Sequence, residues 1–204
     1  MEESAGGARG GSSIMTASGS LPESPSIVLI TGLMASGKST VAQRLAERLP
    51  RSVHLRGDVF RRMIVGGRAE MGFELSEEAE RQLRLRYRVA AAAADLYLEA
   101  GFTVVHQDII LGAGLAEVVR CYAHRPLHVV VLCPRPAVVA AREAGRAKRG
   151  YQDASAVLDF DRVLREETPR LGLWLDTSDL TVEETVNEIL GRLGDARVDG
   201  EGGS

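Results

Sequence analysis

The sequence predicts an α/β fold in which a parallel β-sheet lies between helices. A short apolar run at residues 26–31 leads through a glycine-rich loop into a helical pattern. Strand-like and helix-like segments then alternate along the chain to about residue 194, as in a sheet built from βαβ units. The segment at residues 127–133 (LHVVVLC) is almost wholly apolar, as expected for a strand that helices cover on both faces.

Length and composition limit the class of protein. A chain of 204 residues with 45% hydrophobic residues can form one α/β domain with a good core. The net charge of −3 argues against a protein that coats nucleic acid. No apolar run approaches the roughly 18 residues that span a bilayer, and the N-terminus lacks the layout of a signal peptide. Cys121 and Cys133 match no metal or redox spacing, so we expect reduced thiols in a cytoplasmic protein.

The two ends of the chain differ in composition from its middle. Residues 1–25 are rich in Gly, Ser and Ala and hold few large apolar side chains, so they cannot offset the entropy of ordering. Residues 195–204 (DARVDGEGGS) resemble them. We therefore expect disordered tails at 1–25 and 195–204 and one folded domain at 26–194.

The elements follow from periodicity and from their start and stop signals. Short segments rich in apolar residues, alternating with the helical patterns, predict strands at 26–31, 52–55, 102–106, 127–133 and 173–176. Helical periodicity predicts helices at 38–49, 58–65, 76–100, 115–123, 136–149, 153–167 and 181–193. Ser76, with Glu77 and Glu78 behind it, is a predicted N-cap, and Thr181 with Glu184 forms a capping-box pattern.

The long helix at 76–100 has two distinct faces. Its apolar stripe consists of Leu83, Tyr87, Ala90, Ala94 and Leu98. Another face carries Arg81, Arg84, Arg88, Asp95 and Glu99. These arginines either form a solvated face or line a cleft for an anionic substrate, and both interpretations stay open.

The segment from Gly32 to Ser39 is a complete G-x-x-x-x-G-K-[ST] phosphate-binding signature between a strand and a helix. Its glycines allow backbone angles that direct successive N–H groups into one concavity. Lys38 can reach the β- and γ-phosphates, and the Ser39 hydroxyl can ligate the Mg²⁺ between them. We expect ATP or GTP with Mg²⁺ to bind to Gly32, Met34, Ala35, Ser36, Gly37, Lys38, Ser39 and Thr40.

Two carboxylates follow strands at the edge where the phosphate loop lies. Asp58 comes after the second strand and can accept a proton from an attacking hydroxyl, or else it caps the next helix. Arg61 and Arg62 can orient Asp58 or hold an anionic part of a substrate. Asp108 ends the third strand, where it can reach Mg²⁺ or the acceptor or cap a turn. His106 and Gln107 beside it are weaker candidates.

Two later segments can complete the site. Arg142, Arg146 and Arg149 share one helix face, so the first two can close over the phosphates as a lid, with Gly145 and Gly150 as hinges. A solvated basic face is the alternative. The loop after the last strand carries Thr177 and Ser178, which can contact the base of the nucleotide.

Together these motifs resemble the small P-loop kinases of the nucleoside-monophosphate-kinase-like group, and most of all the chloramphenicol phosphotransferase family. The matching pieces, spread over residues 26–194, are the phosphate loop, Asp58-x-x-Arg61, the stretch from Asp108, the segment Arg142–Arg146 and the loop from Leu175. The resemblance implies a P-loop NTPase three-layer sandwich with a five-stranded parallel sheet of order 2-3-1-4-5 and a mobile lid. It also implies ATP·Mg²⁺ as donor, a small-molecule hydroxyl as acceptor and Asp58 as base. Residues 60–100 show no match, so the resemblance does not name the acceptor.

The sequence thus favours an ATP-dependent phosphotransferase whose acceptor is an antibiotic or another small molecule. Asp58 would act as the base, and Lys38, Arg142 and Arg146 would stabilise the transfer. Alternatives are a kinase of a nucleotide, a sugar acid or a polynucleotide end, although an aromatic content of 4% argues against the last. A regulatory ATP-binding protein without an acceptor is a further alternative. A GTPase switch is disfavoured, since Asn187 is the only asparagine and no Asn-Lys-x-Asp motif exists. Homo-oligomerisation stays open.

Overall fold

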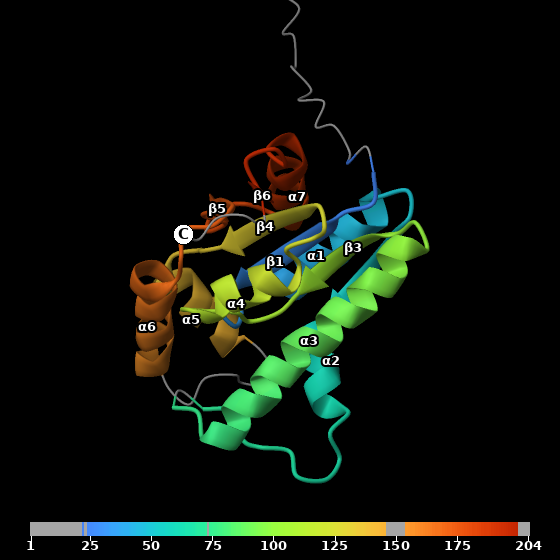
Figure 1. Ribbon diagram of the computed structural model, residues 1–204. Coiled ribbons are helices and arrows are strands. Elements are labelled where there is room, and N and C mark those ends of the chain that lie inside the picture. Colours follow the sequence, from blue (N-terminus) through green and yellow to red (C-terminus); the bar gives the residue numbers. More distant parts are fainter. Residues whose placement is uncertain (1–21, 23, 73, 146–153, 200–204) are drawn as a thin grey trace, which may run out of the picture.

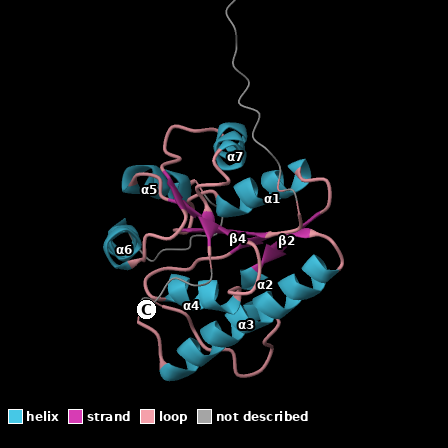
Figure 2. Ribbon diagram, turned by 45° about the horizontal axis from the view of Figure 1, so that its top comes forward, coloured by secondary structure: helices cyan, strands magenta, loops and turns pink. Residues whose placement is uncertain are grey.

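The computed structural model describes residues 22, 24–72, 74–145 and 154–199. Five parallel strands form one sheet in the order β2-β3-β1-β4-β5. Their bounds are Ile27–Gly32 for β1, Ser52–Arg56 for β2, Thr103–Gln107 for β3, Leu127–Leu132 for β4 and Leu173–Leu175 for β5. Helices cover both faces of this sheet (Figures 1 and 2). The predicted three-layer α/β fold and strand order are confirmed.

The helices divide between the two faces of the sheet. On one face lie α1 and α7, and on the other α3 and α4 (Figure 2). The bounds of the helices in the described residues are Lys38–Arg48 (α1), Gly57–Arg62 (α2), Glu77–Glu99 (α3), Gly114–Cys121 (α4), Pro136–Ala144 (α5), Ala154–Arg162 (α6) and Val182–Gly191 (α7). A π-helical segment, Val163–Glu167, continues α6 directly. In this part of the chain no helix is long and apolar enough to cross a membrane.

Alternating side chains of the central strands fill two separate cores. Ile27 and Leu29 of β1 point into the core under α3 and α4, whereas Val28 and Ile30 point into the core under α1 and α7. The same alternation continues in β3, so that His106 faces α4 and Gln107 faces α1. Because the strands are parallel, the residues that follow β1, β2 and β3 meet at one edge of the sheet.

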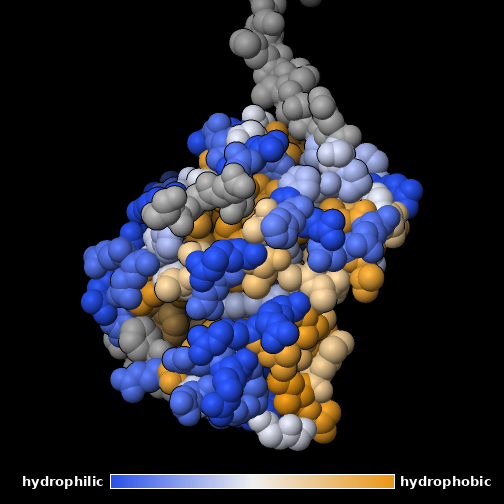
Figure 3. Space-filling model, viewed as in Figure 1, coloured by the Kyte–Doolittle hydropathy of each residue, from blue (hydrophilic) through white to orange (hydrophobic). Residues whose placement is uncertain are grey.

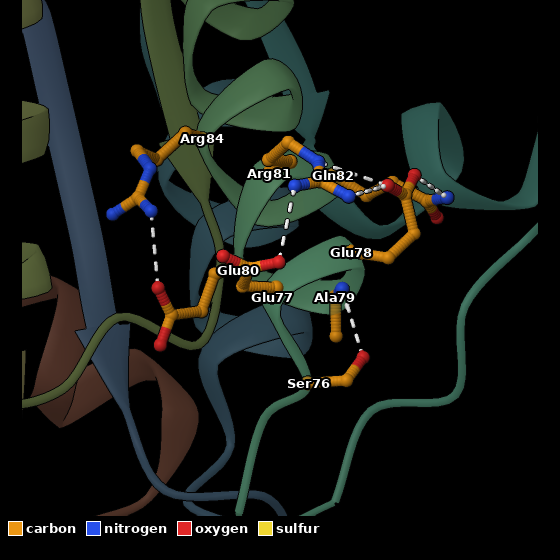
Figure 4. A network of polar contacts seen from close by, with 8 residues as sticks. All are labelled: Ser76, Glu77, Glu78, Ala79, Glu80, Arg81, Gln82 and Arg84. Carbon is orange, nitrogen blue, oxygen red and sulfur yellow. Dashed lines mark hydrogen bonds and ion pairs between the residues drawn. The ribbon is translucent and has the colours of Figure 1, made fainter.

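Local helix signals are confirmed at both predicted caps. The Ser76 hydroxyl accepts a hydrogen bond from the Ala79 N–H at 3.2 Å at the start of α3. Thr181 and Glu184 form the complete capping box of α7. Along α3, Tyr87, Ala90 and Ala94 are buried as expected. The polar face of its first turns is a network of surface ion pairs, in which Arg81 and Arg84 contact glutamates of the same helix (Figure 4).

Some predicted boundaries are wrong. The short helix after β2 ends at Arg62 rather than 65. The helix predicted at 136–149 is described only to Ala144, and residues 146–153 lie outside the described residues. The loose tail predicted from residue 195 is wrong for residues 195–199: Ala196 is fully buried, and Arg197–Val198 form β6, which pairs antiparallel with the start of β4. No local sequence pattern marks so short an added strand.

Candidate active site

The phosphate loop connects β1 to α1 with the backbone geometry that its glycines predict. Gly32 has φ 144° and Gly37 has φ 96°, both in the region that favours glycine. A Cβ on Gly32 would lie 2.3 Å from the Leu132 carbonyl oxygen, so only glycine fits between β1 and β4. The buried Lys38 side chain folds back over the loop, and its Nζ donates to the Leu33 carbonyl at 2.5 Å.

A cleft of about 600 Å³ opens between this loop and the ends of β2 and β3. Its lining is dominated by charged and phosphate-loop residues: Met34, Ala35, Gly37, Lys38, Ser39, Thr40, Arg56, Asp58, Arg62, Arg86, Gln107, Asp108, Ile109 and Arg142. The cleft therefore brings together most of the residues that the sequence singles out. Five cationic and two carboxylate side chains in the lining suit a ligand with several negative charges.

A second hollow, of about 470 Å³, lies across α1 and shares Ser39, Thr40 and Arg56 with the cleft. Its remaining lining consists of surface residues, including Arg44, which pairs with Glu47 and Glu183. It contains neither Lys38 nor Asp58. We therefore assign the chemistry to the first cleft.

Asp58 lies in the first turn of α2, just after β2. Its carboxylate is 45% exposed and faces two arginines, Arg62 at 3.0 Å and Arg56 at 3.8 Å. The exposure leaves the side chain accessible from the cleft. Asp58 thus has the access that a proton acceptor needs.

Arg61 does not take the position that the sequence predicts. Its guanidinium turns away from the cleft, donates to the Ala69 carbonyl at 2.7 Å and lies 3.9 Å from Glu70. Because consecutive residues of an α-helix point about 100° apart, only one of the two arginines faces the cleft, and that residue is Arg62. Arg61 instead fixes the loop after α2.

Asp108 lies at the end of β3 and is buried, with 4% of its side chain exposed. Its Oδ1 accepts a hydrogen bond from the Ile109 N–H at 2.8 Å. Its Oδ2 lies 3.0 Å from Nε of Arg86 on α3, an ion pair in which neither atom makes an aligned hydrogen bond. A Cβ on Gly57 would come within 2.1 Å of the same oxygen, so any larger residue here would displace the Asp108 carboxylate.

Arg86 is the site residue that sequence reasoning missed. Its side chain is 11% exposed and reaches from α3 to the cleft, whereas the neighbouring Arg81, Arg84 and Arg88 lie on the exposed face of the helix. The sequence signal that could have identified Arg86 is its position between the apolar stripe and the solvated face, one residue before the buried Tyr87. An arginine there must extend along the edge of the core toward a partner.

Burial shifts the pKa of two groups, His106 on β3 and Asp108 directly after it. It raises the pKa of Asp108 to about 6, against the opposing effects of Arg86, the Ile109 N–H and Lys38. It lowers the pKa of His106 to about 3, and the positive charge of Arg86 adds to this shift. His106 is fully buried, and its Nδ1 lies 2.9 Å from the Tyr122 hydroxyl. His106 is therefore a neutral core residue rather than part of the cleft.

The cleft fits a magnesium ion by the chemistry of its oxygens. The Ser39 hydroxyl lies 3.4 Å from Oε1 of Gln107, and both line the cleft together with Asp108. Asp108 Oδ2 is a buried oxygen without a hydrogen bond among the described residues. Mg²⁺ takes few protein oxygens and keeps several waters, so a hydroxyl and one carboxylate suffice. No cluster of three or more His, Cys, Asp or Glu suited to a metal occurs in the described ranges.

Arg142 of α5 connects the phosphate loop to the loop after β5. Its guanidinium donates to the Ser36 carbonyl at 3.4 Å and to the Thr177 carbonyl at 3.2 Å. Thr177 is buried, whereas the Ser178 hydroxyl accepts from the Arg135 N–H at 2.8 Å and is directed away from the cleft lining. Arg146, the second predicted lid arginine, lies outside the described residues, as do Lys148 and Arg149.

Comparison with solved structures shows the same fold in several other proteins. The tunicamycin resistance protein of Deinococcus radiodurans superposes with a TM-score of 0.65 and 19% identity over 86% of this chain and 99% of that one. A sugar kinase from a Janibacter species superposes with a TM-score of 0.64 and 20% identity over 84% of this chain and 96% of that one. The APS kinase of Mycobacterium tuberculosis, in complex with AMPPNP and APS, has a TM-score of 0.61 and 22% identity over 85% of this chain and 99% of that one.

No curated protein matches the chain significantly in sequence. A family of P-loop proteins does match: AAA_33, described as AAA domain, covers residues 27–166, from β1 to the π-helical segment. The match includes the phosphate loop, Asp58, Arg86, Asp108 and Arg142. The expected likeness to small P-loop kinases is thereby confirmed for family and fold, and the chain belongs to the AAA_33 family.

Proposed function

We propose that this protein is an ATP-dependent phosphotransferase that moves the γ-phosphoryl group to a hydroxyl of a small molecule. One observation carries the proposal: the same cleft is lined by the phosphate-loop residues Lys38 and Ser39, by the accessible carboxylate of Asp58 and by Arg142. One site thus holds groups that can bind the phosphate donor, activate the acceptor and stabilise the developing charge.

The donor half of the cleft suits ATP·Mg²⁺. The loop amides and the start of α1 face the position of the phosphates, and Lys38 would leave the Leu33 carbonyl to reach them. Ser39, with Asp108 through the water shell, would hold Mg²⁺, which neutralises charge on the β- and γ-phosphates when it is bound. Arg142 already spans the two loops that border this half, so it can stabilise charge on the transferred group.

Asp58 is the better general base of the two carboxylates. A base must reach the proton that it abstracts, and Asp58 is half-exposed in the cleft, whereas Asp108 is buried against Gly57 and paired with Arg86. We assign Asp108 to positioning at the floor of the cleft. Arg62 and Arg56, on either side of Asp58, would hold the acceptor or its developing charge.

The structural relatives support ATP as donor and leave several acceptor classes. One of them is a sugar kinase and another is an APS kinase bound to AMPPNP and APS, so the fold accommodates different acceptors. An antibiotic or other natural product is a candidate acceptor because the tunicamycin resistance protein has this fold. The acceptor side is built from α2, α3 and the loop between them, the part of the chain without a recognisable sequence motif.

Three variants test the assignment. We expect Lys38→Met to weaken ATP binding, measured by calorimetry with Mg²⁺. We expect Asp58→Asn to keep that binding and to lower turnover with an active acceptor by about 10²–10⁴-fold. Asp179→Asn, a surface carboxylate in an ion pair with Arg135, serves as the matched control and should change neither. Full activity of Asp58→Asn would show that another group is the base.

A further inference from the structure

The outer face of α3 carries an apolar stripe that nothing in the described residues covers. Leu85, Val89, Ala92 and Leu96 are all exposed, and they recur at intervals of four, three and four residues. That spacing places them on one line along the helix, opposite the buried Ala90 and Ala94. Figure 3 shows hydrophobic residues gathered beside α3, over α2 and the turn after it, next to the hydrophilic residues of α3. The stripe is roughly 16 Å long at the rise of an α-helix.

The stripe is complementary to itself when a second α3 runs antiparallel to it. A two-fold axis beside the middle of the stripe places Leu85 opposite Leu96 of the second copy and Val89 opposite Ala92. Large residues at both ends and small ones near the centre let two helices approach closely, as helix–helix contacts require. The pattern therefore fits an isologous contact without any further partner.

The charges beside the stripe follow the same symmetry. Arg88 and Asp95 lie on one edge of it, seven residues apart, and the two-fold axis places Arg88 of each copy opposite Asp95 of the other. Arg88 is exposed and has no ion pair among the described residues, whereas Asp95 is 40% exposed and already pairs with Arg125 at 2.8 Å within its own chain. Arg84 and Glu99 lie on this side nearer the two ends of the stripe, and the axis likewise brings Arg84 of each copy near Glu99 of the other.

We propose that a second copy of this chain docks on α3, so that the protein forms a two-fold symmetric dimer through antiparallel α3 helices. One helix face per copy is at the low end of stable interface sizes, so the dimer is reversible and its fraction rises with concentration. The contact lies on the helix that also delivers Arg86 to the cleft, from a flank about 100° around the helix from Leu85. Dimerisation would then hold α3 in place without covering the cleft.

The test is sedimentation equilibrium of the full chain from about 1 to 100 µM, the range of moderate protein affinities. We expect a monomer–dimer equilibrium for the natural protein. Leu96→Glu should raise the dissociation constant at least tenfold. Leu158→Glu, on α6, is the matched control, since Leu158 is 60% exposed and Leu96 69%, and it should leave the constant unchanged within about twofold.

Two further measurements identify the geometry. Arg88→Glu and Asp95→Arg should each remain monomeric alone and form a heterodimer when mixed, because only the mixture restores both charge pairs. Ala92→Cys, in a Cys121→Ser background that removes the exposed native thiol, should form a disulfide-linked dimer on oxidation because Ala92 lies near the axis. A natural protein that stays monomeric at 100 µM overturns the proposal, as does a dimer that Leu96→Glu leaves intact.

Discussion

Replacing Arg86 by methionine tests how much the buried ion pair of α3 contributes to stability, apart from the surface ion pairs on the same helix. Methionine retains the aliphatic packing of Arg86 but leaves Asp108 without its cation at 3.0 Å. Breaking a buried pair from one side costs about 3–5 kcal/mol because the remaining charge is uncompensated. Arg81→Met is the matched control: Arg81 is 61% exposed and pairs with Glu78 at the surface (Figure 4), a contact worth about 0–1 kcal/mol.

The loss in Arg86→Met depends on pH in a defined direction. Burial raises the pKa of Asp108 to about 6 in the folded protein, above its value in the unfolded chain, so folding is favoured by the protonated form and stability falls as pH rises to that pKa. Above pH 6 the carboxylate of the natural protein is ionised and this loss stops. Without Arg86 the pKa rises further, so the variant continues to lose about 1.4 kcal/mol per pH unit, or about 3 kcal/mol by pH 8.

Urea unfolding followed by fluorescence of Trp174, the single tryptophan, measures this difference at pH 6.5, 7 and 8. His106 adds the same pH dependence to both variants, since burial keeps its pKa near 3 and the folded ring neutral, so its contribution cancels from the difference between them. We expect a gap between Arg86→Met and Arg81→Met that widens with pH. A gap that is absent, or that stays constant from pH 6.5 to 8, would refute the assignment of Arg86 as the partner of a buried ionised carboxylate.

Three further predictions concern the same framework. Gly57→Ala should lower the free energy of unfolding by about 1–3 kcal/mol, because its Cβ would meet Asp108 Oδ2 at 2.1 Å. Gly66→Ala, with open space around it, should change this free energy by no more than about 0.5 kcal/mol in urea unfolding. Equal effects of the two substitutions would contradict the packing argument. Burial lowers the pKa of His106 below its value in the unfolded chain, so the stability that the neutral ring contributes is present above pH 6.5 and falls by about 1.4 kcal/mol per pH unit on acidification. His106→Asn should remove this pH dependence of the unfolding free energy between pH 6.5 and 5. An unchanged pH dependence would assign it to other groups. Thr181→Ala should cost about 1 kcal/mol of unfolding free energy by removing the capping box of α7, and no loss would show that the cap is dispensable.

The central fold was predictable because its signals are local. The phosphate-loop octet fixes a strand, a loop and a helix in 14 residues, and the apolar run of β4 marks a strand covered on both sides. Chain order then placed Asp58 and Asp108 on the same edge as the loop, which the structure bears out as residues of one cleft. The strand order came from the family resemblance, since periodicity alone does not determine it.

The errors occurred where long-range packing decides between equal local choices. Arg61 and Arg62 are identical in type and adjacent, and only the position of the loop around Ala69 determines which one faces the cleft. Arg86 belongs to a helix with many arginines, and its role depends on the end of β3, more than 20 residues away. The two-residue strand β6 forms because β4 offers a free backbone edge at its start, which no local pattern encodes.

The most direct test of the central claim is product analysis after incubating the purified chain with ATP, Mg²⁺ and a panel of hydroxyl-bearing small molecules that includes sugars, sugar acids and nucleoside antibiotics. Mass spectrometry distinguishes a phosphorylated panel compound from inorganic phosphate. The proposed function predicts at least one new phosphomonoester that Asp58→Asn no longer produces while it still binds ATP. Tight ATP binding that yields only slow release of inorganic phosphate across the panel would contradict a phosphotransferase and favour a regulatory ATP-binding protein.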